Sequence, residues 1–338
     1  MSIQYGPFTV SNVINTIAVV IPCFRVSRQI LTVIANIGPE VTWIFVVDDA
    51  CPDGSGKHVE QSSLDPRVTL LNHSNNQGVG AAVCTGYRAA LEIGATIIVK
   101  CDGDGQMNPS MIPALCMPII HAQADYVKGN RFYRLHDVAD MPVIRIVGNA
   151  ALSFMCKLSS GYWQIFDPNN GFTAIHCNVL KEIPLARVAK RYFFESDMLY
   201  YLNQSRAVVW ELPMPTRYAD ETSNMNPLTE VQKFAFGHAR NFIRRCIYSY
   251  FIRGFSLASI QLVLGSFLCF FAVLFGGLHW WESVQTGVAA SAGTVMLSAL
   301  PMLIGIQFLL SWVSFDIAAE PRHVIHPLLE NTPVKNAA

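Results

Sequence analysis

The feature that most constrains the fold is an apolar run that ends in two carboxylates one residue apart. Residues 97–101 read as a buried strand, and Asp102, Gly103 and Asp104 follow it directly. The residues just beyond a parallel strand project at the carboxyl edge of the sheet, where open α/β folds bind ligands. In extended backbone, side chains at i and i+2 share a side, and two hard oxygen ligands so placed can hold Mg²⁺ or Mn²⁺. The alternative is a solvated turn, because Asp-Gly pairs are common in turns.

A second apolar run, residues 43–47, also ends in acids, Asp48 and Asp49. Two acid-tipped strands at one sheet edge repel each other unless a cation or a donor-rich ligand offsets the charge. The apolar and turn pattern predicts strands near 17–22, 43–48, 68–72, 96–101 and 125–129, with helices near 27–37, 54–63, 77–93 and 109–122. This alternation predicts a parallel sheet that is covered on both faces.

The helix expected to begin near Gln77 has Gly78 and Gly80 in its first turn. Without a Cβ at these positions, backbone N–H groups can approach an anion. The alternative is that the glycines let the helix pack closely against a neighbour.

Four motifs, in this order along the chain, resemble family 2 inverting glycosyltransferases of the GT-A fold. They are Val20-Ile21-Pro22-Cys23-Phe24, the acidic run from Val46 to Ser55, Asn76-Gln77-Gly78-Val79-Gly80 and Asp102-Gly103-Asp104-Gly105-Gln106. The resemblance is strongest with the branch of dolichol-phosphate mannose synthase and the bacterial polyprenyl-phosphate glycosyltransferases. It covers roughly residues 15 to 225.

The resemblance implies a domain that binds a nucleotide-diphosphate sugar together with Mg²⁺ or Mn²⁺. The metal would be held by Asp102, Asp104 and Gln106, and Asp104 would also be catalytic. The residues implied in binding the donor nucleotide are Pro22, Asp48, Asp49, Asp53, Gly78, Asp102 and Gly103. A loop that contains Arg217 would close over the donor. The sugar pocket would be shaped by Asp167, Asn170 and Gly171.

The acceptor side is expected to begin with Arg131, which follows a predicted strand. Arg145 and Asn149 lie four residues apart on an expected helix, so they share a face. In the resembled synthases, residues at these places contact the phosphate of the lipid, and the planar fork of arginine suits phosphate oxygens. A solvated surface arginine is the alternative at each place.

Glu195 and Asp197 stand where many family 2 enzymes carry a catalytic base. On a helix this spacing points them about 200° apart, so at most one faces the site, and Asp197 alternatively caps the helix. A hydroxyl acceptor needs a base, whereas a phosphate acceptor arrives as an anion. Asn224 stands where many relatives with phosphate acceptors carry a basic residue. Two acceptors therefore remain open, a polyprenyl phosphate and a hydroxyl of a lipid-linked saccharide.

Composition indicates an enzyme attached to a membrane. Charged residues make up 14% of the chain and hydrophobic ones 51%, whereas soluble domains carry roughly 25% charged residues. The net charge is zero, so nothing points to nucleic acid as a partner. The nine cysteines show no spacing typical of a metal site, which favours a reducing compartment. Residues 1–16 lack the basic and apolar regions of a signal peptide, so the catalytic half is expected in the cytoplasm.

Two uncharged stretches, residues 255–278 and 283–315, are long enough to span a bilayer. Arginines precede the first and follow the second, while the loop between them has no Lys or Arg, so both ends are expected on the cytoplasmic side. Buried core helices are the alternative. Before the first stretch, apolar residues recur at helical spacing beside Lys233, Arg240, Arg244, Arg245 and Arg253. This pattern is typical of a helix that lies on an anionic leaflet.

We therefore expect an α/β GT-A catalytic domain with a mostly parallel sheet (1–225), an amphipathic interfacial helix (226–254), a two-helix transmembrane anchor (255–320) and a cytoplasmic tail (321–338). The expected function is inverting transfer of a sugar from a nucleotide-diphosphate sugar to polyprenyl phosphate, by a multi-pass protein of the inner membrane whose catalytic domain faces the cytoplasm. The alternatives are transfer to a hydroxyl of a lipid-linked saccharide in cell-surface polysaccharide synthesis, and a catalytically silent membrane scaffold. The sequence is also compatible with a homo-oligomer.

Overall fold

The computed structural model describes residues 15–133, 143–214 and 227–330, which form two compact units. The first, here called the sheet unit, contains the described residues up to 154, residues 165–234 and residues 321–330. The second, the hairpin unit, contains residues 155–164 and 235–320. The domain boundaries expected from the sequence remain predictions.

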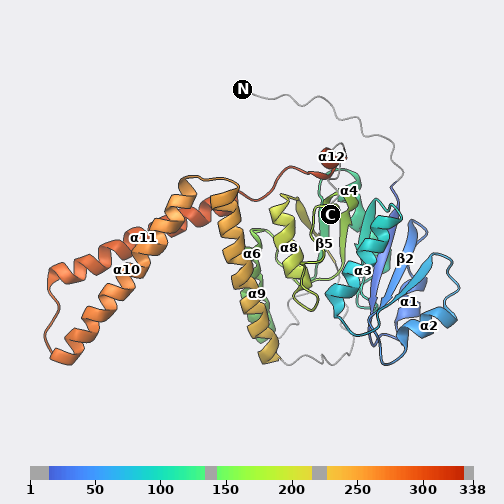
Figure 1. The fold of residues 1–338 in the computed structure, drawn as a ribbon, viewed down its shortest axis with the longest axis horizontal. Coiled ribbons are helices and arrows are strands. Elements are labelled where there is room, and N and C mark those ends of the chain that lie inside the picture. Colours follow the sequence, from blue (N-terminus) through green and yellow to red (C-terminus); the bar gives the residue numbers. More distant parts are fainter. Residues whose placement is uncertain (1–14, 134–142, 215–226, 331–338) are drawn as a thin grey trace, which may run out of the picture. The chain divides into compact units, whose positions relative to one another are not determined.

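The sheet unit is built on a seven-stranded sheet with the order β3-β2-β1-β4-β6-β5-β7 (Figure 1). The strands are β1 (Ile17–Cys23), β2 (Val41–Asp48), β3 (Val68–Asn72), β4 (Ile97–Lys100), β5 (Tyr126–Asn130), β6 (Thr173–His176) and β7 (Val209–Pro213). Neighbouring strands are parallel except at β6, which runs antiparallel to β4 and β5. The carboxyl ends of the other six strands therefore meet at one edge of the sheet.

The helices of this unit connect and cover the strands. They are α1 (Ile30–Ala35), α2 (Ser55–Ser62), α3 (Val79–Glu92), a 3₁₀ turn (Pro109–Met111) leading into α4 (Ile112–Ile120), the first part of α6 (Val143–Ser160), α7 (Cys177–Lys181), α8 (Phe194–Gln204), the start of α9 (Pro227–Ile247) and α12 (His326–Leu329). The five expected strands and the mostly parallel sheet are confirmed. The helix expected at 27–37 is shorter, because the chain makes a turn in which Gln29 N–H donates to Val26 O before α1 begins.

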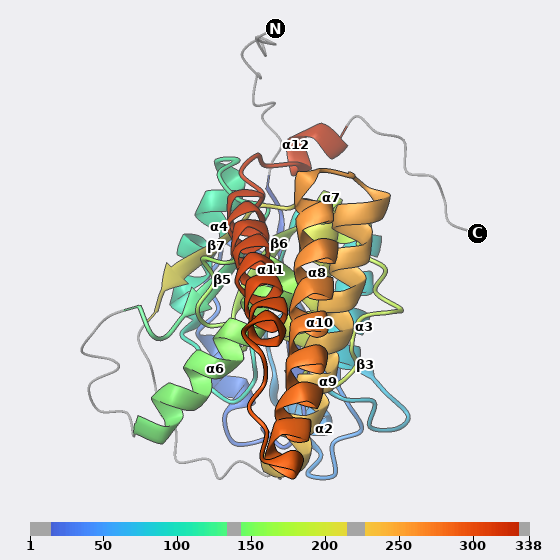
Figure 2. The ribbon, with the colours of Figure 1, turned by 90° about the vertical axis from the view of Figure 1, so that its left-hand side faces the viewer.

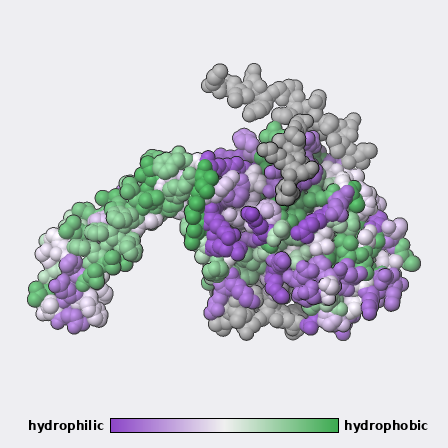
Figure 3. All heavy atoms as spheres, viewed as in Figure 1, coloured by the Kyte–Doolittle hydropathy of each residue, from purple (hydrophilic) through white to green (hydrophobic). Residues whose placement is uncertain are grey.

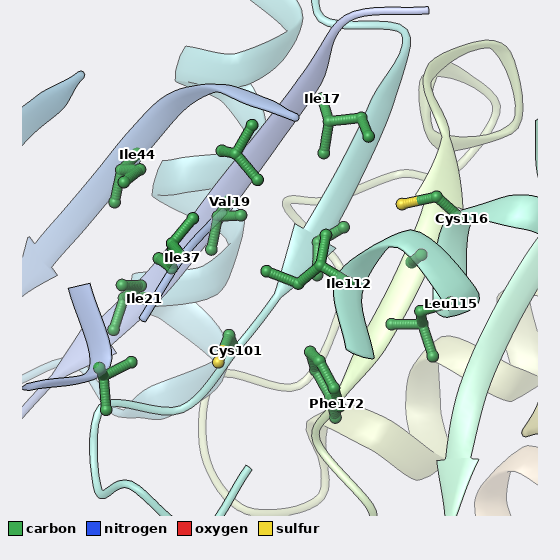
Figure 4. Packing of buried hydrophobic residues seen from close by; sticks show 14 of the residues in the cluster. Ile17, Val19, Ile21, Ile37, Ile44, Cys101, Ile112, Leu115, Cys116 and Phe172 are labelled. Atoms are coloured by element: carbon green, nitrogen blue, oxygen red, sulfur yellow. The ribbon is translucent and has the colours of Figure 1, made fainter. Parts of the chain in front are cut away.

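The two faces of the sheet have different partners. Val19 and Ile21 of β1 and Cys101 after β4 pack with Ile112 of α4 in one buried apolar cluster (Figure 4). Val20 points to the opposite face, where α3 approaches so closely that a Cβ on Gly86 would lie 2.3 Å from a Val20 methyl. Lys100 pairs in register with Val20 and shares this second face.

The hairpin unit contains two long apolar helices, α10 (Leu257–Thr286) and α11 (Ala292–Ala318), which lie side by side (Figures 1 and 2). Both are long and apolar enough to cross a membrane, and most of their residues are exposed, unlike those of a core helix. Figure 3 shows a largely hydrophobic surface along them. A Cβ on Gly305 would lie 2.7 Å from Cys269 Sγ, so the helices approach closely at small residues, as packed membrane helices do. The two expected apolar helices are confirmed.

Arg245 on α9 departs from the expected basic face. Its side chain is 3% exposed, and its guanidinium donates to Asp316 of α11, with Nη1 2.6 Å from Oδ1 and Nη2 2.9 Å from Oδ2. The same Nη2 donates to Leu158 O at 2.8 Å. The exposed side of α9 includes the apolar residues Phe236 and Ile243. Placing Arg245 on a lipid-facing basic surface was therefore wrong, because the side chain is buried and its charge is compensated by Asp316, which lies far along the sequence.

The chain that follows α11 returns to the sheet unit. Asp125, just before β5, is fully buried and accepts hydrogen bonds from Ile325 N (3.0 Å), His326 N (2.8 Å) and Val208 N (2.8 Å). His326 Nδ1 lies 2.9 Å from the same carboxylate, and the His326 ring stacks on His176 at 4.2 Å. One buried carboxylate thus anchors the C-terminal segment to the sheet unit.

Candidate active site

The two acids at the end of β2 are bound by the loops that follow them. Asp48 accepts from Cys51 N at 2.7 Å and from Gly56 N at 3.1 Å, which fixes the loop into α2. Asp49 accepts from Gln77 N at 2.8 Å and Gly78 N at 2.7 Å, and His73 Nδ1 lies 2.7 Å from it. These carboxylates therefore shape the expected nucleotide-binding loops from within.

The N-terminus of α3 is filled by the chain's own anion. The Gly78 N–H, expected to meet a ligand, points at Asp49 instead. A Cβ on Gly80 would lie 2.3 Å from Ala189 O, so the close-packing alternative is confirmed for this glycine. Asp53 lies exposed in the loop before α2, and Pro22 is buried at the end of β1.

The end of β4 carries a buried cation between two acids. Lys100 Nζ lies 2.7 Å from Asp102 Oδ1 and 3.1 Å from Glu195 Oε1 on α8. The Lys100 side chain is 1% exposed, Glu195 11% and Asp102 28%. Burial alone would lower the pKa of Lys100, but the charges of Asp102 and Glu195 outweigh it and raise the pKa. Lys100 therefore stays charged and joins the expected metal ligand to the expected base.

The remaining residues of this loop leave an accessible acidic edge. Gln106 N donates to Asp104 Oδ1 at 3.0 Å. Gly103 is buried against α1, where a Cβ would lie 2.9 Å from Ile30. Asp102, Asp104 and Gln106 are all partly exposed. Within the described residues no three His, Cys, Asp or Glu side chains form a metal-binding group. A pair of carboxylates with an amide fits Mg²⁺ or Mn²⁺, which takes its other ligands from phosphate and water.

The loop that precedes β6 closes over this cluster. A Cβ on Gly171 would lie 2.2 Å from Lys100 Nζ and 2.6 Å from Asp102 Oδ2, so a side chain there would displace these two charged groups. Asn170 Nδ2 lies 2.9 Å from Met214 Sδ, and its Oδ1 accepts from Phe172 N at 3.0 Å. The Asn170 side chain is 3% exposed and holds the loop rather than lining its surface.

Arg131 is held by Asp167 in a two-point ion pair. Nε lies 2.8 Å from Oδ2 and Nη2 3.0 Å from Oδ1, and the Arg131 backbone N–H also donates to this carboxylate. Burial would raise the pKa of Asp167, but the hydrogen bonds and charge of Arg131 hold it below the usual value. The Arg131 side chain is 34% exposed, its guanidinium carbon lies 5.7 Å from the Phe132 ring centre, and Phe132 meets Phe166 edge to face. An oriented cation thus sits among aromatic side chains.

Asp197 accepts from Ala189 N at 2.8 Å, whereas Glu195 pairs with Lys100. This agrees with the expectation that at most one of Glu195 and Asp197 faces the site. Asn149 lies half-buried on α6. Arg145 begins the same helix, but its side chain lies outside the described residues, as does the whole of Arg217.

Three site residues were missed from the sequence: Lys100, His73 and Glu211. Glu211 Oε1 accepts from Phe166 N at 2.9 Å and Asp167 N at 2.8 Å, and burial raises its pKa. The sequence did contain one signal, because Lys100 is a single charged residue in a run that predicts a buried strand. A buried charge requires a partner of opposite charge. The partner itself, Glu195, cannot be found from spacing.

The residues around this site match a known family. The model of glycosyl transferase family 2 matches residues 18–184. A UDP-N-acetylglucosamine–dolichyl-phosphate N-acetylglucosaminyltransferase of Methanococcus voltae is 30% identical over 218 residues, which are 60% of this chain and 86% of that protein. The chain belongs to glycosyl transferase family 2. An undecaprenyl-phosphate mannosyltransferase of Micrococcus luteus is 30% identical over 51% of this chain and 70% of its own length.

The fold of this glycosyltransferase also matches solved structures. Glucosyl-3-phosphoglycerate synthase from Mycobacterium tuberculosis, in complex with Mn²⁺, UDP and glucosyl-3-phosphoglycerate, superposes with a TM-score of 0.52 at 20% identity, covering 69% of this chain and 80% of that one. The expected GT-A fold and enzyme class are confirmed. The two apolar helices indicate that this glycosyltransferase associates with a membrane.

Proposed function

We propose that this glycosyltransferase transfers a sugar, with inversion, from a nucleotide-diphosphate sugar to a polyprenyl phosphate. Two of its relatives are named for transfer involving dolichyl phosphate and undecaprenyl phosphate. Helices α10 and α11 would keep the enzyme beside a lipid acceptor.

On the donor side, Asp102, Asp104 and Gln106 would hold Mg²⁺ or Mn²⁺, which supplies positive charge for the leaving diphosphate. Asp48 and Asp49 would act indirectly, by fixing the loops that meet the nucleotide. Gly171 lets the neighbouring loop approach Asp102 and Lys100 closely.

On the acceptor side, the proposal rests on the fixed position of the Arg131 guanidinium. Asp167 fixes the guanidinium plane, while the nearby rings of Phe132 and Phe166 offer apolar surface. Phe166 is 39% exposed and Tyr133 65% exposed. A cation set among exposed aromatic rings suits a phosphate that carries an isoprenoid chain.

The carboxylates expected to act as a base have other partners. Glu195 pairs with the Lys100 ammonium, and Asp197 accepts the amide of Ala189. A phosphate acceptor is already ionised and needs no base, which favours it over a saccharide hydroxyl.

We further propose that α10 and α11 span the inner membrane, with the sheet unit in the cytoplasm. Arg253 precedes the hairpin and Arg322 follows it, while the loop between the helices carries neither Lys nor Arg. This asymmetry supports an orientation with both ends of the hairpin on the cytoplasmic side.

The test is the initial rate with polyprenyl phosphate as the only acceptor, at saturating Mn²⁺. Arg131→Ala should raise the half-saturating lipid concentration about 10- to 100-fold, the usual worth of charge-assisted hydrogen bonds. Arg131→Lys, which keeps a charge beside Asp167, should show a smaller rise. Glu195→Gln should stay within about tenfold of wild type, since general-base catalysis is worth about 10²- to 10⁴-fold.

Arg88→Ala is the matched control, because Arg88 is an exposed arginine on α3 away from these contacts. Wild-type kinetics in both arginine-131 variants, combined with a dead Glu195→Gln, would replace polyprenyl phosphate by a saccharide hydroxyl as the acceptor. Absence of any sugar transfer by the purified wild type from a panel of nucleotide sugars would support the silent scaffold.

A further inference from the structure

A buried ammonium occupies the centre of the acidic site. Lys100 is the residue before the acidic loop, and its side chain is 1% exposed. It therefore cannot reach a substrate, and it acts only through the groups it touches. Those groups are Asp102 at 2.7 Å and Glu195 at 3.1 Å.

A neighbouring strand and a loop enclose Lys100. The register places it opposite Thr173 of β6, and Thr173 in turn lies opposite Lys128 of β5. Gly171 lies directly against its Nζ and against Asp102 Oδ2. An ammonium held this way cannot swing out when a cation arrives, so it remains a neighbour of any ion bound by Asp102.

We propose that Lys100 is a positioning residue that sets the affinity of this site for the divalent cation. Its ammonium occupies one oxygen of Asp102 and offsets part of the acidic charge. Two like charges so close repel, so the site binds the free ion weakly. The ion is then held firmly only when the diphosphate of the donor adds its own negative oxygens, and it can leave again with the nucleotide product.

Glu195 has the opposite effect on the affinity for the ion. It shares the Lys100 ammonium with Asp102, and so it draws some of that positive charge away from the metal side. Removing Lys100 and removing the charge of Glu195 should therefore change the affinity for the ion in opposite directions. A residue with a merely structural role gives no such sign reversal.

This inference rests on the metal-dependent donor site of the proposed function. The probe is Mn²⁺ alone, without nucleotide, titrated against the full-length protein in detergent. Bound ion is read from the loss of the free-Mn²⁺ electron paramagnetic resonance signal and from the rise in melting temperature. Lys100→Met should lower the Kd for Mn²⁺ at least about tenfold, while turnover falls. Glu195→Gln should raise the Kd several-fold.

Lys128→Met is the matched control, because Lys128 is an equally buried lysine two strands away. It should change the Mn²⁺ affinity far less than Lys100→Met does. If Lys100→Met does not fold, the double variant Lys100→Met with Glu195→Gln leaves no excess buried charge. It should bind Mn²⁺ more tightly than Glu195→Gln alone.

An unchanged or weaker affinity in Lys100→Met, or a double variant no tighter than Glu195→Gln, would overturn the inference. If the wild type binds no Mn²⁺ even with UDP or GDP present, the metal site of the proposed function fails together with it. Loss of transfer to polyprenyl phosphate with the Mn²⁺ pattern intact would remove only the acceptor assignment.

Discussion

Asp125 should control whether the C-terminal segment stays on the sheet unit, and Asp125→Asn tests this with almost no change in volume. The wild-type carboxylate serves four donors: Val208 N, Ile325 N, His326 N and His326 Nδ1, at 2.8 to 3.0 Å. The asparagine keeps one accepting oxygen and turns an NH₂ group toward the donors of the other.

Each hydrogen bond to a charged, buried group is worth about 1.5 to 3 kcal/mol. Ile325 N, His326 N and His326 Nδ1 all meet Oδ1, so in the asparagine these three donors share one uncharged oxygen. Loss of the charge costs about 1 kcal/mol for each bond, or about 3 kcal/mol in all, which corresponds to roughly a 100-fold larger open population. Amide hydrogen exchange of residues 323–330 should therefore speed up about 100-fold, while exchange in β1 and β2 stays unchanged.

Asp65→Asn is the control. Asp65 is a partly exposed acid paired with Arg67 at 2.7 Å, and such pairs contribute about 0 to 1 kcal/mol. It should leave exchange in the C-terminal segment unaltered. Wild-type protection of that segment in Asp125→Asn would refute the anchoring argument.

Three further predictions concern the metal, the membrane and pH. Asp104→Asn should lower turnover by orders of magnitude with an unchanged circular dichroism spectrum, and near-normal turnover would remove its metal role. Ser283→Cys, made in a variant without reactive native thiols, should react with an impermeant maleimide only from outside the cytoplasm. Labelling from the cytoplasmic side alone would reverse the proposed topology. Burial and the neighbouring His326 lower the pKa of His176 from 6.5 to about 3, so the unfolded chain binds more protons and stability falls as the pH drops through this window. His176→Asn keeps an acceptor for Asn178 N–H and should make the melting temperature fall less between pH 7 and pH 4 than it does in the wild type. An equally steep fall would show that other groups cause the loss of stability.

The fold was predictable because its signals are local. Apolar strand runs, turn residues and acid-tipped ends alternate at short range, so the strands from β1 to β5 could be placed within a few residues. The long uncharged stretches of α10 and α11 are equally visible in the sequence. Asp102 and Asp104 could be placed at the carboxyl edge of the sheet because they follow an apolar strand run directly.

The partners of charged residues were not predictable, because they come from far along the chain. Lys100 at the end of β4 meets Glu195 on α8, and Arg245 meets Asp316 across 71 positions. A local pattern of basic residues on α9 suggested a lipid-facing surface for Arg245, yet the tertiary fold buries it. Pairings of this kind depend on which elements pack together, and no spacing rule encodes that.

The anchoring of Ile325 and His326 by Asp125 changes how a truncated enzyme should be interpreted. In the order of the chain, the apolar helices are an insertion within the sheet unit rather than an appendage at its end. Stopping translation before α10 would also delete Ile325 and His326 and leave Asp125 as a buried charge with only Val208 N of its four donors, a defect that costs stability on its own. Inactivity of such a protein would not distinguish a need for lipid from a damaged fold. Excising residues 235–320, which removes Arg245 together with its partner Asp316, and rejoining the flanks through a flexible linker would keep the contacts of Asp125 with Ile325 and His326. Such a protein would separate the contribution of the membrane from damage to the sheet unit.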